Sequence, residues 1–215
     1  MESFAELQKS LIAGTEARVK ELVAKLIAQG VAPKEIISKG LISGMAEVGK
    51  RFREGDMFIP EVMLCARTMS ASMALLEPLI VGAPFQISGK VIMGTVEGDV
   101  HNIGKDIVSI MLRGAGFAVI DLGVQVQAER FVQAVLEHKP DVLGMSALLT
   151  TTMPRMKEVI QLLDKRGLRH NVQIIVGGAP VTQEFADEIG ANGYSPDAGS
   201  AIDKVKELLG GPLAS

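Results

Sequence analysis

The sequence predicts an α/β protein in two parts: an N-terminal four-helix bundle followed by a flavodoxin-like (Rossmann-like) domain with five parallel strands. Three observations support this prediction. Apolar residues in about the first eighty positions recur at helical spacing, short apolar runs then alternate with helical stretches, and a segment containing Gly82 and Pro84 separates the two patterns. We therefore expect a helical domain over residues 1–84, a linker over Val81–Ser88 and an α/β domain over residues 88–212.

Each of the four expected helices has its own apolar stripe. The first contains Phe4, Leu7 and Leu11, and the second is expected between Thr15 as N-cap and Gly30 as the stop. Pro33 suits the first turn of the third helix, and the fourth is expected from about residue 59 to residue 80. Short connections between such helices favour a small antiparallel bundle.

The second half alternates strand and helix patterns. Its strand-like runs are almost wholly apolar, as in strands that are buried on both faces of a parallel sheet. In such folds, ligands bind at the carboxyl ends of the strands, near the point where the strand order reverses. The expected strands are Val91–Thr95, Ala118–Leu122, Val142–Ser146, Ile174–Val176 and Gly193–Tyr194, and the expected helices are Ile103–Leu112, Ala128–Leu136, Pro154–Leu163, Thr182–Ile189 and Ala201–Leu209.

Composition excludes several classes of function. The net charge of −3 gives no overall attraction to nucleic acid or to an anionic membrane. A single cysteine, Cys65, excludes an intramolecular disulfide framework and fits a reducing cytoplasm. The N-terminus does not have the pattern of a signal peptide, and no uninterrupted apolar stretch reaches the ~18 residues of a membrane span. We expect a cytoplasmic protein without nucleic-acid or membrane partners.

Three segments should meet at the carboxyl ends of the strands: Glu97–Gly104, Ser146–Thr152 and Gly177–Pro180. Their spacings do not match a dinucleotide-binding G-x-G-x-x-G turn, a P-loop or the G-x-S-x-G elbow of hydrolases. What remains is His101 with Asp99 two residues before it. A metal-bound imidazole usually donates its second ring N–H to a carboxylate, so this pair suits a metal ligand and its orienting group.

The motif D-x-H-x-x-G, here Asp99, His101 and Gly104, is followed by S-x-L at Ser146–Leu148 and by G-G at Gly177–Gly178. The three together resemble the signature of cobalamin-binding domains. Residues Phe52–Val62 resemble the helical cap of cobalamin-dependent methionine synthase and of the corrinoid proteins of methyltransferase systems. The resemblance extends over residues 1–210.

The resemblance implies a role for each motif residue. His101 would bind cobalt in place of the cofactor's own base, Asp99 would hydrogen-bond His101, and Thr152 would extend that relay. Methionine synthase has serine at the relay position, so threonine departs from the pattern while keeping the hydroxyl. The cofactor-binding residues implied in the α/β domain are Gly98, Asp99, Val100, His101, Asn102, Ile103, Gly104, Ser146, Leu148, Thr150, Gly177, Gly178 and Ala198, and in the helical cap Phe52, Ile59 and Val62.

These residues also have purely structural interpretations, which the sequence leaves open. Asp99 suits a cap of the following helix, and Ser146 and Thr150 suit turns whose backbone they would satisfy. Gly177–Gly178 also suits a tight turn. Phe52, Ile59 and Val62 suit an ordinary apolar core stripe.

The function implied is that of a corrinoid methyl carrier, which is not a catalyst on its own. Its cofactor would be cobalamin, alternating between methylcobalamin and cob(I)alamin. The implied partners are a donor-specific methyltransferase, a second methyltransferase with a folate or thiol acceptor, and a reductive activation protein. The cap would move aside for each partner, which implies a hinge at Val81–Ser88. The alternatives are an adenosylcobalamin-dependent mutase subunit, which generally lacks the helical cap, and a B12 sensor, which needs an output module.

Overall fold

The computed structural model describes residues 4–79 and 89–210. It contains two compact units, one formed chiefly by the residues before position 89 and one formed chiefly by those after it. The predicted linker and hinge at Val81–Ser88, and the predicted domain ends at residues 84, 88 and 212, lie outside the described residues.

The first unit is helical, as predicted. Three of its described elements are consecutive: α3 (Pro33–Glu35), the π-helical segment η1 (Ile36–Ile42) and α4 (Ser43–Glu54). They form the single third helix that the sequence predicts, although the π-helical segment within it was not predicted. The other helices of this unit are α1 (Phe4–Ile12), α2 (Glu16–Ala28), α5 (Ile59–Leu76) and the short 3₁₀ turn η2 (Glu77–Leu79).

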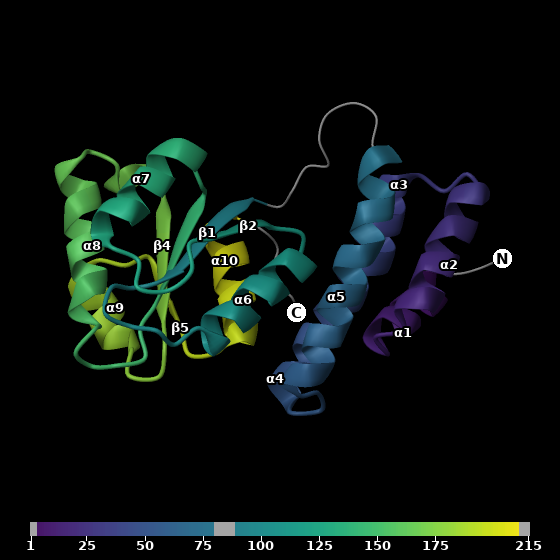
Figure 1. Cartoon of the computed structure of the whole chain (residues 1–215), viewed down its shortest axis with the longest axis horizontal. Helices are drawn as coiled ribbons and strands as arrows, with labels where there is room; N and C mark the ends of the chain where they lie inside the picture. Colours follow the sequence, from purple (N-terminus) through teal and green to yellow (C-terminus); the bar gives the residue numbers. More distant parts are fainter. Residues whose placement is uncertain (1–3, 80–88, 211–215) are drawn as a thin grey trace. The chain divides into compact units, whose positions relative to one another are not determined.

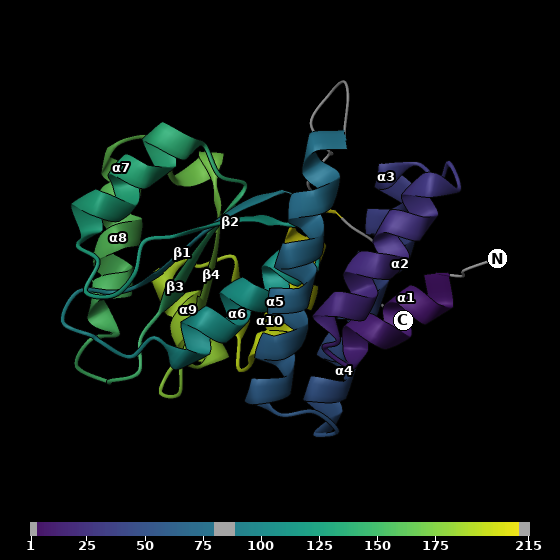
Figure 2. The same cartoon turned by 45° about the vertical axis from the view of Figure 1, so that its right-hand side comes forward.

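Close helix contacts hold this bundle together. Helix α1 contacts α2 and the η1–α4 segment, and α5 contacts α2 and α4 (Figure 2). Two glycines permit the approach of α1, because a Cβ atom on Gly40 would lie 2.5 Å from Leu7 Cδ2 and one on Gly44 would lie 2.9 Å from Leu11 Cδ2. Thr15 lies at the predicted N-cap of α2 but makes no side-chain capping bond.

Helix α5 also has the length and apolar composition of a membrane span, with a mean hydropathy of 1.2 over 18 residues. Such a pattern is weak support for a span, since core helices share it. Its contacts with α2 and α4 make α5 a central helix of the bundle. The buried side chains of α5 are Val62, Cys65, Thr68, Met69, Ser72 and Leu76.

The second unit is built on the predicted five-stranded parallel sheet, in the order β2-β1-β3-β4-β5. This is the flavodoxin-like order, and it reverses between β1 and β3. The strands are β1 (Lys90–Thr95), β2 (Ala118–Asp121), β3 (Val142–Ser146), β4 (Gln173–Gly177) and β5 (Gly193–Ser195). The helices are α6 (Ile103–Gly114), α7 (Ala128–His138), α8 (Pro154–Lys165), α9 (Gln183–Ile189) and α10 (Ala198–Leu208), with a 3₁₀ turn η3 at Arg169–Asn171.

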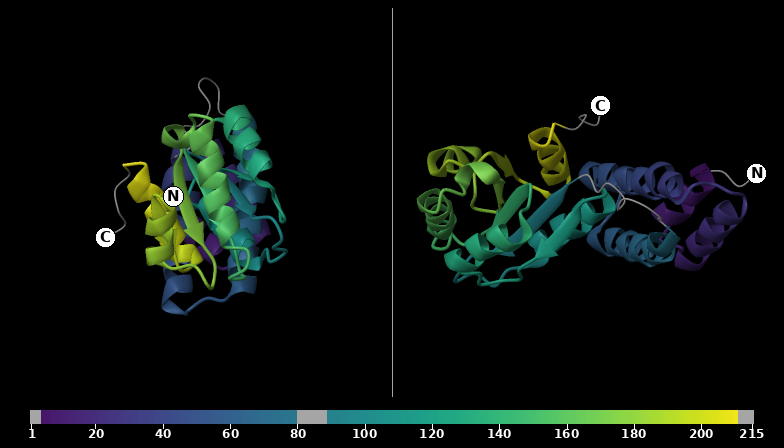
Figure 3. Two further views of the ribbon diagram at one scale, coloured as in Figure 1. Left: turned by 90° about the vertical axis from the view of Figure 1, so that its left-hand side faces the viewer. Right: turned by 90° about the horizontal axis from the view of Figure 1, so that it is seen from above.

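The helices form two layers around the sheet. Helices α7, α8 and α9 lie against one face, and α6 and α10 against the other (Figures 1 and 3). Phe131 of α7 is completely buried in the core of the first face. It packs over β1 where Gly94 has no side chain, since a Cβ atom there would lie 2.6 Å from Phe131 Cε1.

This topology brings the predicted motif loops to one edge. The loops after β1, β3 and β4 leave the carboxyl ends of three adjacent strands, on both sides of the reversal in strand order. His138 and His170 come just before β3 and β4, so they lie at the opposite, amino edge. His101 is therefore the histidine that the fold places at the carboxyl edge among the described residues.

Truncation of Phe131 tests the packing of α7 on the sheet. The substitution Phe131→Ala should lower the free energy of unfolding by about 3–5 kcal/mol, because it removes a fully buried ring and leaves a cavity. Urea denaturation followed by circular dichroism measures this change. The matched control is Leu136→Ala on the exposed side of the same helix, which should shift stability by no more than about 0.5 kcal/mol. Equal losses in the two variants would contradict the packing described here.

Candidate functional site

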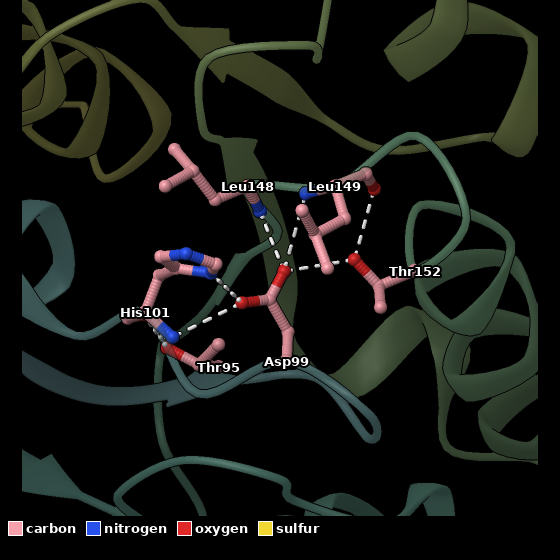
Figure 4. Close-up of polar contacts among 6 residues, drawn as sticks. All are labelled: Thr95, Asp99, His101, Leu148, Leu149 and Thr152. Atoms are coloured by element: carbon pink, nitrogen blue, oxygen red, sulfur yellow. Dashed lines mark hydrogen bonds and ion pairs between the residues drawn. The ribbon is translucent and has the colours of Figure 1, made fainter.

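The site is organised around the completely buried carboxylate of Asp99 (Figure 4). Its Oδ1 atom lies 2.7 Å from Nδ1 of His101 and accepts the backbone N–H of His101 at 3.1 Å. The contact is local, since only Val100 stands between the partners in the sequence and the loop after β1 turns back on itself. Gly98 permits that turn with a left-handed φ of 80°.

The other carboxylate oxygen of Asp99 holds the loop after β3. Its Oδ2 atom accepts the backbone N–H of Leu148 at 2.7 Å, that of Leu149 at 3.3 Å and the hydroxyl of Thr152 at 2.8 Å. The hydroxyl of Thr152 also lies 2.9 Å from the carbonyl oxygen of Leu149, so its one proton has two possible acceptors. Asp99 thus joins the loops that flank the reversal in strand order.

These donors determine the charge of Asp99. Burial on its own would raise the pKa of the carboxyl, but the hydrogen bonds from the Leu148 and His101 amides, the imidazole and the Thr152 hydroxyl outweigh burial and hold the Asp99 pKa well below its usual range. Asp99 is therefore a carboxylate at neutral pH. The alternative that Asp99 caps the following helix is wrong, because its described partners lie outside α6.

An ionised Asp99 also fixes the proton on His101. A carboxylate only accepts hydrogen bonds, so the 2.7 Å contact requires that Nδ1 of His101 carry the proton. In the neutral imidazole, the second ring nitrogen, Nε2, then has a free lone pair. It makes no hydrogen bond within the described part of the chain, and the side chain is 45% exposed. A neutral imidazole held in this way has the arrangement of a metal ligand whose other ring nitrogen is hydrogen-bonded to a carboxylate.

The backbone around His101 is held from two sides. The buried hydroxyl of Thr95, at the end of β1, donates to the carbonyl oxygen of His101 at 3.0 Å. The backbone N–H of Gln125, in the loop after β2, donates to the carbonyl oxygen of Asp99 at 3.0 Å, and Gln125 adopts a left-handed φ of 53°. The imidazole therefore projects from a loop whose main chain is anchored to the sheet.

Exposed apolar side chains accompany this imidazole. Val100 and Ile103, on either side of His101, are 59% and 68% exposed, and Leu148 and Leu149 are also exposed. Val124 adds an exposed side chain from the loop after β2. Exposed large apolar groups that gather at a strand-end site indicate a binding surface for a partly apolar ligand.

Comparison with known proteins identifies the family of the chain. A family model described as a B12 binding domain matches residues 89–203, and a second model with the same description matches residues 4–77. The chain belongs to the B12-binding corrinoid proteins. Its cofactor is accordingly a corrinoid, as the sequence motifs predict.

Relatives of this corrinoid protein match over most of their length. A dimethylamine corrinoid protein of Methanosarcina acetivorans is 49% identical, over 82% of this chain and 84% of the relative. A dimethylamine corrinoid protein of Methanosarcina barkeri is 46% identical, over 97% of this chain and 98% of the relative. The methanol:cobalamin methyltransferase complex MtaBC from Methanosarcina barkeri contains a chain with a TM-score of 0.88 and 33% identity, which covers 98% of this chain and 80% of that one.

The residues at the carboxyl edge fit a corrinoid. A corrin ring surrounds its cobalt with four nitrogens, and the imidazole of His101 has the chemistry of a further donor to such a metal. The loop after β1 also has room beside it, since a Cβ atom on Gly104 would meet nothing within 4 Å. At the end of β4 the backbones meet closely, because a Cβ atom on Gly178 would lie 1.9 Å from the carbonyl oxygen of Ala147.

The structure brings most of the predicted site residues of the α/β domain to this edge. Gly98 to Gly104 form the loop after β1 and the start of α6, Ser146 ends β3, and Leu148, Thr150 and Thr152 follow it. Gly177 ends β4, and Gly178 also forms a turn by accepting the N–H of Val181. Ala198 is buried at the start of α10 after β5. Their contacts with the cofactor stay predictions.

The three residues predicted in the cap differ in exposure. Ile59 is exposed at the start of α5, Phe52 is half-buried on α4, and Val62 is buried. The structure also exposes Phe58 and Met63, which were not predicted to have a role. Contact of Phe52, Ile59 and Val62 with the cofactor stays a prediction.

Sequence reasoning missed several groups in the site. The amides of Leu148 and Leu149 bind Asp99 through the main chain, and every residue other than proline has such a donor, so the sequence contains no signal for them. Thr95 had a weak signal, as a polar residue at the end of an apolar strand. Its hydroxyl anchors the main chain of His101.

Removal of the Thr152 hydroxyl tests the Asp99 network. The substitution Thr152→Val keeps the shape but deletes a donor to a buried carboxylate, and it should lower the free energy of unfolding by about 1.5–3 kcal/mol. Urea denaturation of the protein without cofactor measures it. The exposed neighbour offers a matched control, Thr151→Val, which should change stability by less than about 0.5 kcal/mol. An unchanged stability in Thr152→Val would show that the hydroxyl contributes nothing to holding Asp99.

Proposed function

We propose that this protein is a methyl carrier that holds its corrinoid with the cofactor's base displaced and with His101 as a cobalt ligand. The observation that carries the proposal is the pair formed by His101 and Asp99. Nδ1 lies 2.7 Å from a buried carboxylate and the His101 side chain is 45% exposed, so Nε2 of the neutral imidazole has a lone pair for a metal. A bound corrinoid supplies a cobalt ion that can accept a methyl group and release it.

The chain's own residues would orient the ligand and adjust its basicity. Asp99 holds the Nδ1 proton of His101, which strengthens Nε2 as a donor, and Thr152 holds Asp99 in place from the other side. The imidazole is exposed while its main chain is anchored by Thr95, so the side chain is able to bind or leave a metal without rearrangement of the sheet.

The segments at the other strand ends would hold the displaced nucleotide tail. Ser146, Thr150, Gly177, Gly178 and Ala198 surround the ends of β3, β4 and β5. Exposed apolar residues of the loops after β1 and β3, including Val100, Ile103 and Leu148, would contact the corrin ring. Gly104, at the start of α6, would also line the slot for the nucleotide tail, and Gly98 and Asn102 belong to the loop before it.

The relatives indicate the class of methyl donor. The two relatives described above have dimethylamine in their names, and a trimethylamine corrinoid protein of Methanosarcina mazei is 43% identical. We infer that the donor-side partner is a methyltransferase specific for a methylamine. The acceptor-side partner would be a second methyltransferase acting on a folate or thiol, and a reductive activation protein would restore oxidised cofactor.

The two parts of the chain would have separate tasks in this cycle. Residues 88–212 would bind the cofactor, and residues 1–84 would form a cap in which Phe52, Ile59 and Val62 shield the methyl group. The protein would present its cofactor to the partner enzymes in the cytoplasm and would not catalyse transfer alone.

Electron paramagnetic resonance of the cobalt(II) form tests the ligand. Protein that contains nitrogen-15 histidine should show a two-line nitrogen splitting where unlabelled protein shows a three-line splitting, because the nuclear spin changes. The splitting should be lost in His101→Ala and kept in His138→Ala, since His138 lies at the opposite edge of the sheet. A nitrogen splitting that is the same with and without the histidine label would show that the cofactor keeps its own base, and the ligand assignment would be wrong.

Methyl transfer in a reconstituted mixture tests the donor. Protein loaded with reduced cofactor should be methylated by dimethylamine together with the methyltransferase that serves the Methanosarcina barkeri dimethylamine relative. The spectral change of the cofactor reports the reaction, and that relative is the positive control. Methylation by a trimethylamine or methanol system alone would reassign the donor, and no methylation by any of them would contradict the carrier function.

A further inference from the structure

A buried lysine lies four residues beyond His101. The side chain of Lys105 is only 1% exposed, and its Nζ atom lies 2.5 Å from Oδ1 of Asp106 and 2.5 Å from Oδ2 of Asp121. The two carboxylates are not equally buried with it, since the side chain of Asp106 is 42% exposed and that of Asp121 is 28% exposed. The ammonium therefore lies inside the unit while its partners reach solvent.

This cluster connects the end of β2 to the loop that carries His101. Asp121 is the last residue of β2, and its other oxygen accepts the N–H of Gly123 at 2.9 Å. Asp106 receives a hydrogen bond from the side chain of Asn102 at 2.9 Å and donates its own N–H to the Asn102 carbonyl at 2.8 Å. Asn102 follows His101 directly, so the charge cluster reaches the residue next to the metal ligand.

The loop needs such an anchor because packing does not hold it. Residues 100–104 are all exposed, and Lys105 is the first buried residue after His101. On the N-terminal side, Asp99 and the Thr95 hydroxyl hold the imidazole and the carbonyl oxygen of His101. On the C-terminal side, the described contacts of the loop run through Asn102 and Asp106 to Lys105.

Stability alone does not account for a charge at this position. Replacement of a buried ion pair by an apolar side chain of similar size is often neutral or stabilising, because burial of the charges costs desolvation. Methionine would suit the space of the Lys105 stem, and both aspartates would stay in contact with water. The ion pairs of Lys105 instead hold the first turn of α6 against the end of β2.

We propose that Lys105 is a positioning residue for the axial ligand: its ion pairs with Asp121 and Asp106 fix the main chain on the C-terminal side of His101. The inference rests on the proposed function of His101 as the cobalt ligand. Loss of the Lys105 charge would let the loop shift and would weaken binding through His101, while the fold stays intact.

A double-mutant cycle on cofactor affinity tests this proposal. Aquocobalamin is titrated into the full chain without cofactor, with Lys105→Met made in the wild-type and in the His101→Ala background. In the wild-type background, Lys105→Met should weaken binding by about tenfold or more, as for other groups that orient a metal ligand. In the His101→Ala background it should have no further effect. Asp121→Asn, which keeps the shape of the side chain but removes its charge, is the second variant. It should give the same result as Lys105→Met, and it provides the test if Lys105→Met does not fold.

Controls separate positioning from general loss of structure. Lys157→Met removes an exposed ion pair with Glu188 in the same unit and should leave affinity unchanged. The thermal midpoint of the cofactor-free protein should be similar in all folded variants. Equal weakening in both backgrounds, or no weakening in the wild-type background, would overturn the positioning role while histidine ligation stands. Unchanged affinity in His101→Ala itself, with no histidine splitting in the resonance spectrum, would overturn the ligand assignment and this inference together.

Discussion

One buried carboxylate determines how the carboxyl edge of the sheet is assembled. Asp99 has no contact with solvent, and its negative charge is stabilised by donors from its own loop and from the loop after β3. Without those donors, a charge at this depth would be very costly. The two loops must therefore stay together for Asp99 to remain ionised, and an ionised Asp99 is what places the proton of His101 on Nδ1.

The elements of the fold were predictable because the two halves have different apolar periods. The predicted strands coincide with the observed ones to within one residue at each end, since strands that are buried on both faces leave unbroken apolar runs such as Val142–Ser146. The π-helical segment Ile36–Ile42 was not predictable, because α- and π-helical turns differ in hydrogen bonding but not in residue type.

The site was predictable only where side chains supply its chemistry. The spacing of Asp99 and His101 indicated their contact, and Thr152 was expected to extend it. The amides of Leu148 and Leu149 had no signature, because main-chain donors do not depend on residue type. The buried position of Lys105 was equally unexpected, since its two partners come from α6 and from the distant end of β2.

The use of main-chain amides to hold Asp99 affects which substitutions this loop tolerates. A substitution at Leu148 or Leu149 changes a side chain that faces outward but leaves the N–H groups that hold the carboxylate, with proline as the one exception. The hydrogen bonds from this loop to Asp99 are thus kept when its side chains change. The outer surface of this loop is therefore free to change without loss of the hydrogen bonds that hold Asp99 beside His101.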